Sequence, residues 1–91
     1  MEKICTGMTA TSLAGHDRGK VYLIIHADAA YVYLADGKCR TLDRPKRKKR
    51  NIYEIAPRIS PWIAAVLDQG KTIQNSDIIR AMREYGCQQE V

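Results

Sequence analysis

The chain has 91 residues, 45% of them hydrophobic, which suits one small domain with a modest core. Its formal net charge is +5, and no apolar run approaches the roughly 20 residues that a membrane-spanning helix needs. The start, M-E-K-I-C-T-G, lacks the apolar stretch of a secretion signal, so we expect a cytoplasmic protein without a membrane partner.

The positive charge is concentrated in one stretch. Residues 38–50 carry eight basic side chains and one acidic one, whereas residues 62–91 carry three basic and four acidic ones. A localised cationic patch is typical of nucleic-acid binding. An anionic membrane surface is the weaker alternative, because Arg44–Arg50 offers lipid no apolar or aromatic side chain.

The first part of the chain predicts short strands joined by tight loops. Gly7–Leu13 is a Thr-rich segment of modest strand character. Val21–Ile25 is apolar on both faces, as expected of a central strand. The segment between them, A-G-H-D-R-G-K, predicts a tight loop with positive-φ glycines. His26–Ala30 is the next predicted turn.

A β-hairpin is predicted to follow. Tyr31–Leu34 is rich in strand formers, and Asp36 with Gly37 predicts a two-residue type I′ turn. The returning strand is expected over Lys38–Leu42. Pro45 lacks the N–H that a ladder needs, so strand pairing is expected to stop near it.

Five consecutive cations come after this hairpin, from Lys46 to Arg50. Such a run cannot be buried and its charges repel one another, so an anionic partner is expected. Each lysine or arginine that meets a backbone phosphate releases a counterion, which gives salt-sensitive binding. The alternative is a solvated connector with no partner.

Beyond the cations the character of the sequence changes. Ile52–Ile55 predicts one last short strand, closed by Pro57, which completes a small antiparallel barrel or a strongly curled sheet. Ser60 and Pro61 then form a helix start, with the helix running to Gln69.

A second helix is predicted with Asn75 as its N-cap and Gly86 as its stop. Its apolar stripe contains Ile78, Ile79, Met82 and Tyr85. We therefore expect a helical hairpin, with Trp62 as its anchor because an indole offers the largest contact area.

No catalytic constellation is visible. His16 and Asp17 are adjacent, but spacing places no nucleophile beside them, and the glycine loop does not match a nucleotide-binding P-loop. The three cysteines, Cys5, Cys39 and Cys87, show no C-x-x-C spacing. Together with the two histidines they could hold a metal ion. The better interpretation is that they are buried or inert thiols in a reducing compartment. We expect a non-enzymatic protein with no cofactor or small-molecule substrate.

The aromatic residues allow two interpretations. Tyr31, Tyr33 and Trp62 could stack on bases, as exposed aromatic side chains do with single-stranded nucleic acid. The favoured alternative is that they belong to the core.

The chain resembles the bacterial KOW-domain RNA-binding proteins, relatives of KOW-type large-subunit ribosomal proteins of archaea and eukaryotes. The likeness rests on G-M-T-A-T-S-L-A-G-H-D-R-G-K-V-Y-L-I-I, on L-A-D-G-K-C-R and on R-P-K-R-K-K-R-N, and it covers about residues 7–55. The resemblance implies an SH3-like (KOW) barrel of about five short strands and contact with structured, typically ribosomal, RNA. The fold class expected is thus mainly β with appended helices: residues 1–58 form the barrel with its basic tail, and residues 59–91 the C-terminal helical hairpin.

The family's RNA-binding positions, carried over to this sequence, lie in the glycine loop, the hairpin and the cationic run. To these candidates we add Arg50, the last cation of the run. They are Gly15, Asp17, Arg18, Gly19, Lys20, Lys38, Arg40, Lys46, Arg47, Lys48, Lys49 and Arg50. The function expected is RNA binding in the translation apparatus, with ribosomal proteins as further partners. Two alternatives stay open: a protein-interaction adaptor and a small DNA-binding nucleoid protein.

Overall fold

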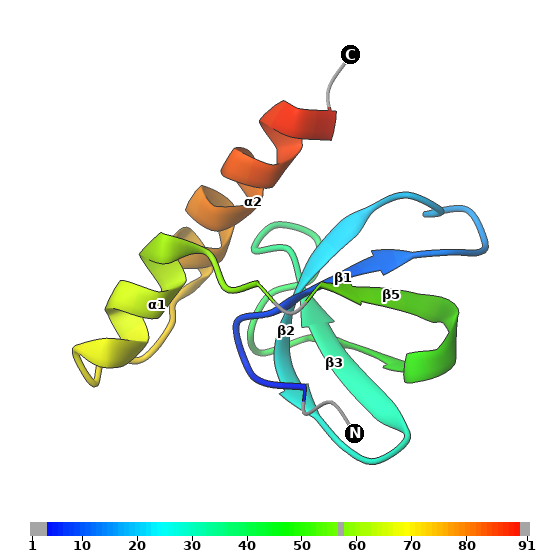
Figure 1. Cartoon of the computed structure of the whole chain (residues 1–91), viewed down its shortest axis with the longest axis horizontal. Helices are drawn as coiled ribbons and strands as arrows, with labels where there is room; N and C mark the ends of the chain where they lie inside the picture. Colours follow the sequence, from blue (N-terminus) through cyan, green and yellow to red (C-terminus); the bar gives the residue numbers. More distant parts are fainter. Residues whose placement is uncertain (1–3, 57, 90–91) are drawn as a thin grey trace.

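The computed structural model describes the backbone of residues 4–56 and 58–89, and within that part the side chains up to residue 83. Five strands form one antiparallel sheet, and two helices follow it (Figure 1). The elements are β1 (Thr9–Ser12), β2 (Val21–Ala27), β3 (Tyr31–Ala35), β4 (Lys46–Lys49), the 3-10 turn η1 (Arg50–Ile52), β5 (Tyr53–Ala56), α1 (Pro61–Asp68) and α2 (Asn75–Gln89). The expectation of a mainly β fold with helices after it is confirmed. Neither helix, over the part described, has the length and apolar character needed to span a bilayer.

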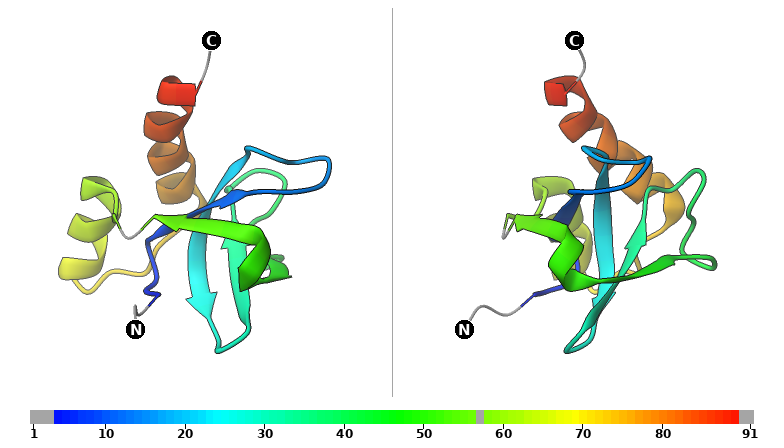
Figure 2. Two further views of the ribbon diagram at one scale, coloured as in Figure 1. Left: turned by 45° about the vertical axis from the view of Figure 1, so that its right-hand side comes forward. Right: turned by 90° about the vertical axis from the view of Figure 1, so that its right-hand side faces the viewer.

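The strand order in the sheet is β4-β3-β2-β1-β5. The strands cross at steep angles, so the open sheet is strongly curled (Figure 2). The predicted strand Val21–Ile25 lies in β2 at the centre of the sheet, and Tyr22, Leu23 and Ile24 are all buried. Its apolar character on both faces is therefore explained by burial on both faces.

The partner of β3 differs from the prediction. Lys38–Leu42 forms no strand; instead the cationic run forms β4, with Leu34 opposite Lys46 and Tyr31 opposite Lys49. Strand pairing therefore begins just after Pro45, whereas the sequence predicts that it stops near this residue. A lysine-rich strand is tolerated here because β4 lies at the edge of the sheet, where side chains can reach solvent.

The predicted two-residue turn is also wrong. Among the described residues only glycines have a positive φ, so Asp36 cannot take the conformation of a type I′ turn. Residues 36–45 form a longer loop that is closed around the Asp36 carboxylate. Asp36 Oδ1 accepts hydrogen bonds from the backbone N–H groups of Lys38 and Arg40, each at 2.9 Å. A side chain that caps its own loop replaces the expected strand pairing.

Two groups of buried side chains occupy opposite faces of the sheet. The inner group consists of Ala10, Tyr22, Ile24, Val32, Leu34 and Tyr53. The outer group joins Leu23 and Ala35 of the sheet to buried residues of the helical segment, namely Ile63, Val66, Ile73, Ile78 and Ala81. The helices thus share a core with the sheet. The division into residues 1–58 and 59–91 stays a prediction.

The start of α1 at Pro61 is confirmed, and β5 ends at Ala56; Pro57 lies outside the described residues. Helix α2 runs through Gly86, so the predicted stop there is wrong. A glycine inside a helix costs only about 1 kcal/mol relative to alanine, which neighbouring turns can offset. The side chain of Tyr85 lies outside the described part.

Asn75 does not act as the predicted N-cap. Its Oδ1 atom instead accepts a hydrogen bond from the backbone N–H of Leu42 at 2.9 Å, which ties the loop at residues 36–45 to α2. The carbonyl of Gln74 accepts the first helical hydrogen bonds, and Asp77 Oδ2 accepts one from the Gln74 N–H at 2.9 Å. Gln74 and Asp77 therefore form one half of a capping box.

Candidate functional site

The glycine loop between β1 and β2 is tightly closed. The Ser12 N–H donates to the carbonyl of Lys20 at 3.0 Å, and the Gly19 N–H donates to the carbonyl of Ser12 at 2.8 Å. Gly15 and Gly19 have φ values of +82° and +88°, as the sequence predicts. This closure fixes the direction in which Asp17 points.

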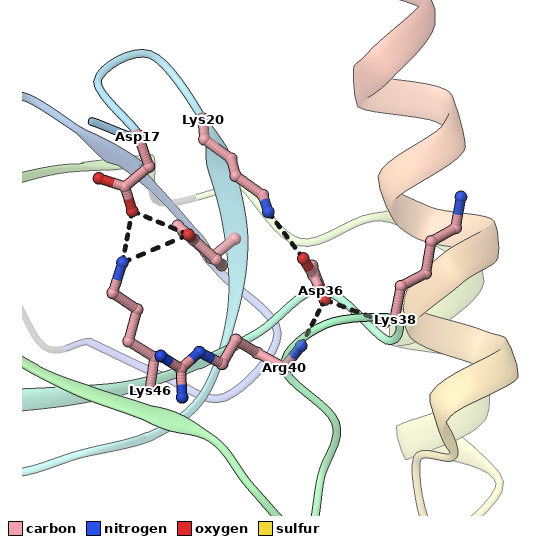
Figure 3. Close-up of polar contacts among 7 residues, drawn as sticks. Asp17, Lys20, Asp36, Lys38, Arg40 and Lys46 are labelled. Atoms are coloured by element: carbon pink, nitrogen blue, oxygen red, sulfur yellow. Dashed lines mark hydrogen bonds and ion pairs between the residues drawn. The ribbon is translucent and has the colours of Figure 1, made fainter.

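Asp17 ties the loop to β4. Its Oδ2 atom accepts a hydrogen bond from the Tyr22 hydroxyl at 2.8 Å and forms an ion pair with Lys46 Nζ (Figure 3). Its Oδ1 atom lies 3.2 Å from Ser12 Oγ. The Lys46 ammonium, followed by the Tyr22 hydroxyl, holds the pKa of Asp17 well below its usual range, although burial opposes this. Asp17 is therefore a permanent anion that holds Lys46 in place.

A second ion pair links β2 to the loop at residues 36–45. Lys20 Nζ lies 2.9 Å from Asp36 Oδ2. Burial opposes ionisation of Asp36, but the N–H of Arg40, the Lys20 ammonium and the N–H of Lys38 outweigh it and lower its pKa to about 2. The hydrogen bond to Asp36 in turn raises the pKa of Lys20. Lys20 therefore stays charged at neutral pH.

Both paired lysines lie against one aromatic ring. Lys20 Nζ and Lys46 Nζ are 5.0 Å and 5.1 Å from the centroid of the Tyr22 ring, within the range of cation–π attraction. Burial, then the hydrogen bond to Asp17, raises the pKa of Tyr22, so its hydroxyl stays protonated at neutral pH and continues to donate.

These groups surround an open hollow of about 530 Å³, which we call the basic hollow. Its wall contains four cations and one carboxylate. The residues that line it are Ser12, Ala14, Gly15, His16, Asp17, Lys20, Tyr22, Cys39, Arg40, Lys46, Lys48, Ile52 and Tyr53. Arg40 and Lys48 are exposed, and neither side chain forms an ion pair or hydrogen bond with another side chain of the described part. They are thus available to an anion.

The hollow brings together half of the candidates that the sequence predicts. Three segments far apart in the chain supply them: Gly15, Asp17 and Lys20 from the glycine loop and its end, Arg40 from the next loop, and Lys46 and Lys48 from β4. Arg18 and Gly19 are exposed members of the same loop but do not line the hollow. Lys38 lines a different hollow beside α2, and it points away from Asp17 and Lys46 (Figure 3).

The remaining cations of the run do not line the hollow. Arg47 and Lys49 project from the opposite face of β4, because successive side chains of a strand alternate. The guanidinium of Arg50 donates to the carbonyls of Ala29 at 3.0 Å and Asp28 at 3.4 Å. Residues 46–49 therefore form a strand whose members have distinct roles, Arg50 begins η1, and the expectation of a tail beyond the sheet is wrong.

The sequence argument missed the polar role of Tyr22. The signal was present, since a tyrosine within an apolar strand usually needs a partner for its hydroxyl. Neither Tyr31 nor Tyr33 is in the core, contrary to the favoured interpretation: both are partly exposed and outside the two buried groups. Trp62 packs against the outer group, and its indole N–H donates to Asp77 Oδ1 at 3.0 Å.

The thiols and potential metal ligands are scattered. Cys5 is partly buried and Cys39 is exposed. Of the expected buried or inert thiols, burial is therefore wrong for Cys39, and inertness stays a prediction. The side chain of Cys87 lies outside the described part. Within that part, no group of three or more His, Cys, Asp and Glu residues is placed to hold a metal ion.

Comparison with known proteins adds no family to this geometry. The sequence matches no protein-family model, and a search of curated proteins gave no significant match.

Proposed function

We propose that this protein is a non-enzymatic RNA-binding protein of the translation apparatus, acting in the cytoplasm on structured, ribosomal RNA. The observation that carries the proposal is the basic hollow, where three separate segments converge on one cationic concavity. Converging cations suit the closely spaced phosphates of a folded nucleic acid. Two hydroxyls of the hollow, those of Ser12 and Tyr22, donate to Asp17, but the lowered pKa of Asp17 makes it a weak base, so binding rather than catalysis suits the arrangement.

The strand arrangement supports an SH3-like barrel of the KOW type. The sheet has five antiparallel strands, and a single 3-10 turn joins β4 to β5. A strongly curled sheet of five short strands fits the barrel of about five short strands that the family resemblance implies. The contacts between α1 and α2, such as that of Trp62 with Asp77, likewise support a helical hairpin.

Within the hollow we assign different roles to paired and unpaired cations. Lys46 and Lys20 are each held by a carboxylate, so they set the shape and the electrostatic potential of the hollow. Arg40 and Lys48 are free to meet phosphate directly. Asp17 is anionic and cannot bind phosphate itself; it positions Lys46.

The test is the salt dependence of RNA binding. Replacing Arg40 and Lys48 by glutamine should lower the slope of log affinity against log salt by about 1.5, since each phosphate contact contributes roughly 0.7–0.9. The matched control replaces Arg58 and Lys71 by glutamine, because both are exposed cations outside the hollow. Both double variants lose the same charge. An equal change of slope in the two would show that only net charge matters and would refute the hollow as the contact.

Two further measurements address the partner. Structured RNA and duplex DNA should compete unequally, with RNA the stronger competitor; preference for duplex DNA would favour a nucleoid protein. Cosedimentation with ribosomes, reduced by the Arg40 and Lys48 substitutions but not by the control substitutions, would support the translation apparatus. Absence of any cosedimentation at low salt would contradict it.

A further inference from the structure

A second surface carries features that the basic hollow does not explain. It lies on the opposite face of β4 and continues across β3 to β2, and we call it the outer plate. Its members are His26, Tyr31, Tyr33, Arg47 and Lys49. In the antiparallel register Tyr33 lies opposite both His26 and Arg47, and Tyr31 lies opposite Lys49. Residues directly opposite one another project to the same side of a sheet, so these five share one face.

The helices leave this face open. Along β3, Val32 and Leu34 point into the inner core, whereas Tyr31, Tyr33 and Ala35 point to the outer side. Ala35 is completely covered and belongs to the core shared with the helices. The two tyrosines are only partly buried, because α1 and α2 lie to one side of the sheet, away from the turn between β2 and β3 (Figures 1 and 2).

Two pairs of side chains on the plate are already in contact. The guanidinium of Arg47 lies 3.9 Å from the centroid of the Tyr31 ring. The His26 and Tyr33 rings are 5.2 Å apart, and a register shift between Ile24 and His26 brings them together. Five neighbouring side chains thus provide three aromatic rings, one guanidinium plane and one ammonium.

Asp28 fixes one end of the plate. Its Oδ2 atom accepts a hydrogen bond from the Tyr33 hydroxyl at 3.3 Å, and its Oδ1 atom lies 3.1 Å from His26 Nε2. Both rings are therefore held by their edges, and the His26 side chain remains 65% exposed. The carboxylate also repels phosphate at this end, so a nucleic-acid backbone is directed toward Arg47 and Lys49.

We propose that the outer plate binds unpaired RNA bases by stacking, next to the phosphate contacts of the basic hollow. This inference rests on the proposed RNA binding. Bases that are unpaired stack on aromatic rings and on arginine guanidinium planes, and stacking tolerates any sequence. Arg47, already held on Tyr31, offers its outer plane to a base, while Lys49 meets the backbone. Strand β4 carries both surfaces, with Lys48 in the hollow and its neighbours on the plate, so one RNA can reach both across this edge.

The ligand expected from this arrangement is folded RNA with a bulge, loop or single-stranded end rather than a continuous duplex. The bases of a duplex are stacked on one another and cannot lie on the plate. A protein partner fits less well, because lysine is depleted in protein interfaces, whereas Lys49 of the plate and the adjoining basic hollow both attract a polyanion.

The experiment compares a short single-stranded RNA with the duplex formed by that strand and its complement. Tyr33→Leu removes a ring, and Arg47→Lys removes the guanidinium plane while keeping the charge. Each should weaken single-strand binding by about tenfold and change duplex affinity by less than about twofold, given the usual strength of base–aromatic stacking. The salt slope for Arg47→Lys should be unchanged. The Arg40 and Lys48 double variant, in contrast, should weaken binding of both RNAs.

A spectroscopic readout on the unaltered protein avoids any folding defect of the variants. The ring proton resonances of His26 and Tyr33 should shift on addition of single-stranded RNA but not of duplex. Unchanged single-strand affinity in both plate variants, with unmoved ring resonances, would overturn the inference while leaving the proposed function intact. Failure of the unaltered protein to bind either RNA would overturn both.

Discussion

Replacing Gly37 by alanine should drive the loop at residues 36–45 away from helix α2. A Cβ atom at this position would lie 2.7 Å from Ile79 Cγ1, 2.8 Å from the carbonyl oxygen of Asn75 and 3.1 Å from the backbone N of Ile79. Side-chain atoms can move aside, but the contacts with backbone atoms can be relieved only by shifting the helix or the loop. Gly37 also has a φ of +84°, which strains any L-residue with a side chain.

The expected loss of stability has two parts. The left-handed conformation costs roughly 1–2 kcal/mol for a residue with a Cβ atom. Forcing an extra methyl group into a packed contact typically adds about 1–3 kcal/mol. Together these give about 2–5 kcal/mol, a large share of the roughly 5–15 kcal/mol that stabilises a typical domain. In a chain of this size the melting temperature should fall by about 10 °C or more.

Gly70→Ala provides the matched control. Gly70 has a φ of +72°, but among the described residues beyond its two chain neighbours no heavy atom lies within 4 Å of its added Cβ, so this variant carries the strain without the clash. Thermal and urea unfolding of both variants should show a smaller loss for Gly70→Ala, by about 1–3 kcal/mol. Equal losses would refute the close approach of the loop to α2, and a Gly37→Ala variant as stable as the unaltered protein would refute the positive φ as well.

Two further predictions concern acid sensitivity and cooperativity. The folded pKa of Asp36 is about 2 against an ordinary 3.8, so its ionisation stabilises the fold above about pH 4, and this contribution of about 2 kcal/mol is lost as the pH falls toward 2. Urea midpoints measured at pH 7 and near pH 2 should therefore differ less in Asp36→Asn than in the unaltered protein; an identical difference would contradict the Asp36 contacts. The fluorescence of Trp62, the only tryptophan, and far-UV circular dichroism should report one coincident unfolding transition, because sheet and helices share a core. Two separate transitions would instead indicate independent units.

The elements that could be predicted from the sequence are those with local signals. Val21–Ile25 is apolar on both faces, and a central strand covered on both faces accommodates such a run. Pro61 marks the start of α1 because its fixed φ and missing N–H suit a first helical turn. The positive φ values at Gly15 and Gly19 follow from a short polar loop between two strands.

The elements that could not be predicted depend on distant residues. Nothing local favours a strand over Lys46–Lys49, since lysine is depleted in strands. That strand exists because Tyr31–Leu34 pairs with it and because Asp17 holds Lys46. Likewise the side chain of Asn75 binds the Leu42 N–H across the fold, a contact that sequence spacing cannot indicate.

The candidate site was predictable in charge but not in arrangement. The sequence locates the cations, and half of the predicted residues do line one hollow. Which cations are paired and which are free depends on the register of β4, and a shift by one residue would exchange the two faces. Only the structure therefore shows that Lys48 lies on one face of β4 and that Arg47 and Lys49 lie on the other.

The composition of β4 also bears on how the protein behaves at high concentration. An edge strand offers backbone donors and acceptors to any second strand that approaches, and a row of lysines and arginines is a common protection against such pairing. In this chain every residue of β4 is cationic, so two copies that align their β4 edges would repel one another. A bound polyanion would cancel that repulsion. RNA in substoichiometric amounts should therefore promote self-association of the protein, and excess RNA should reverse it as each copy acquires its own strand.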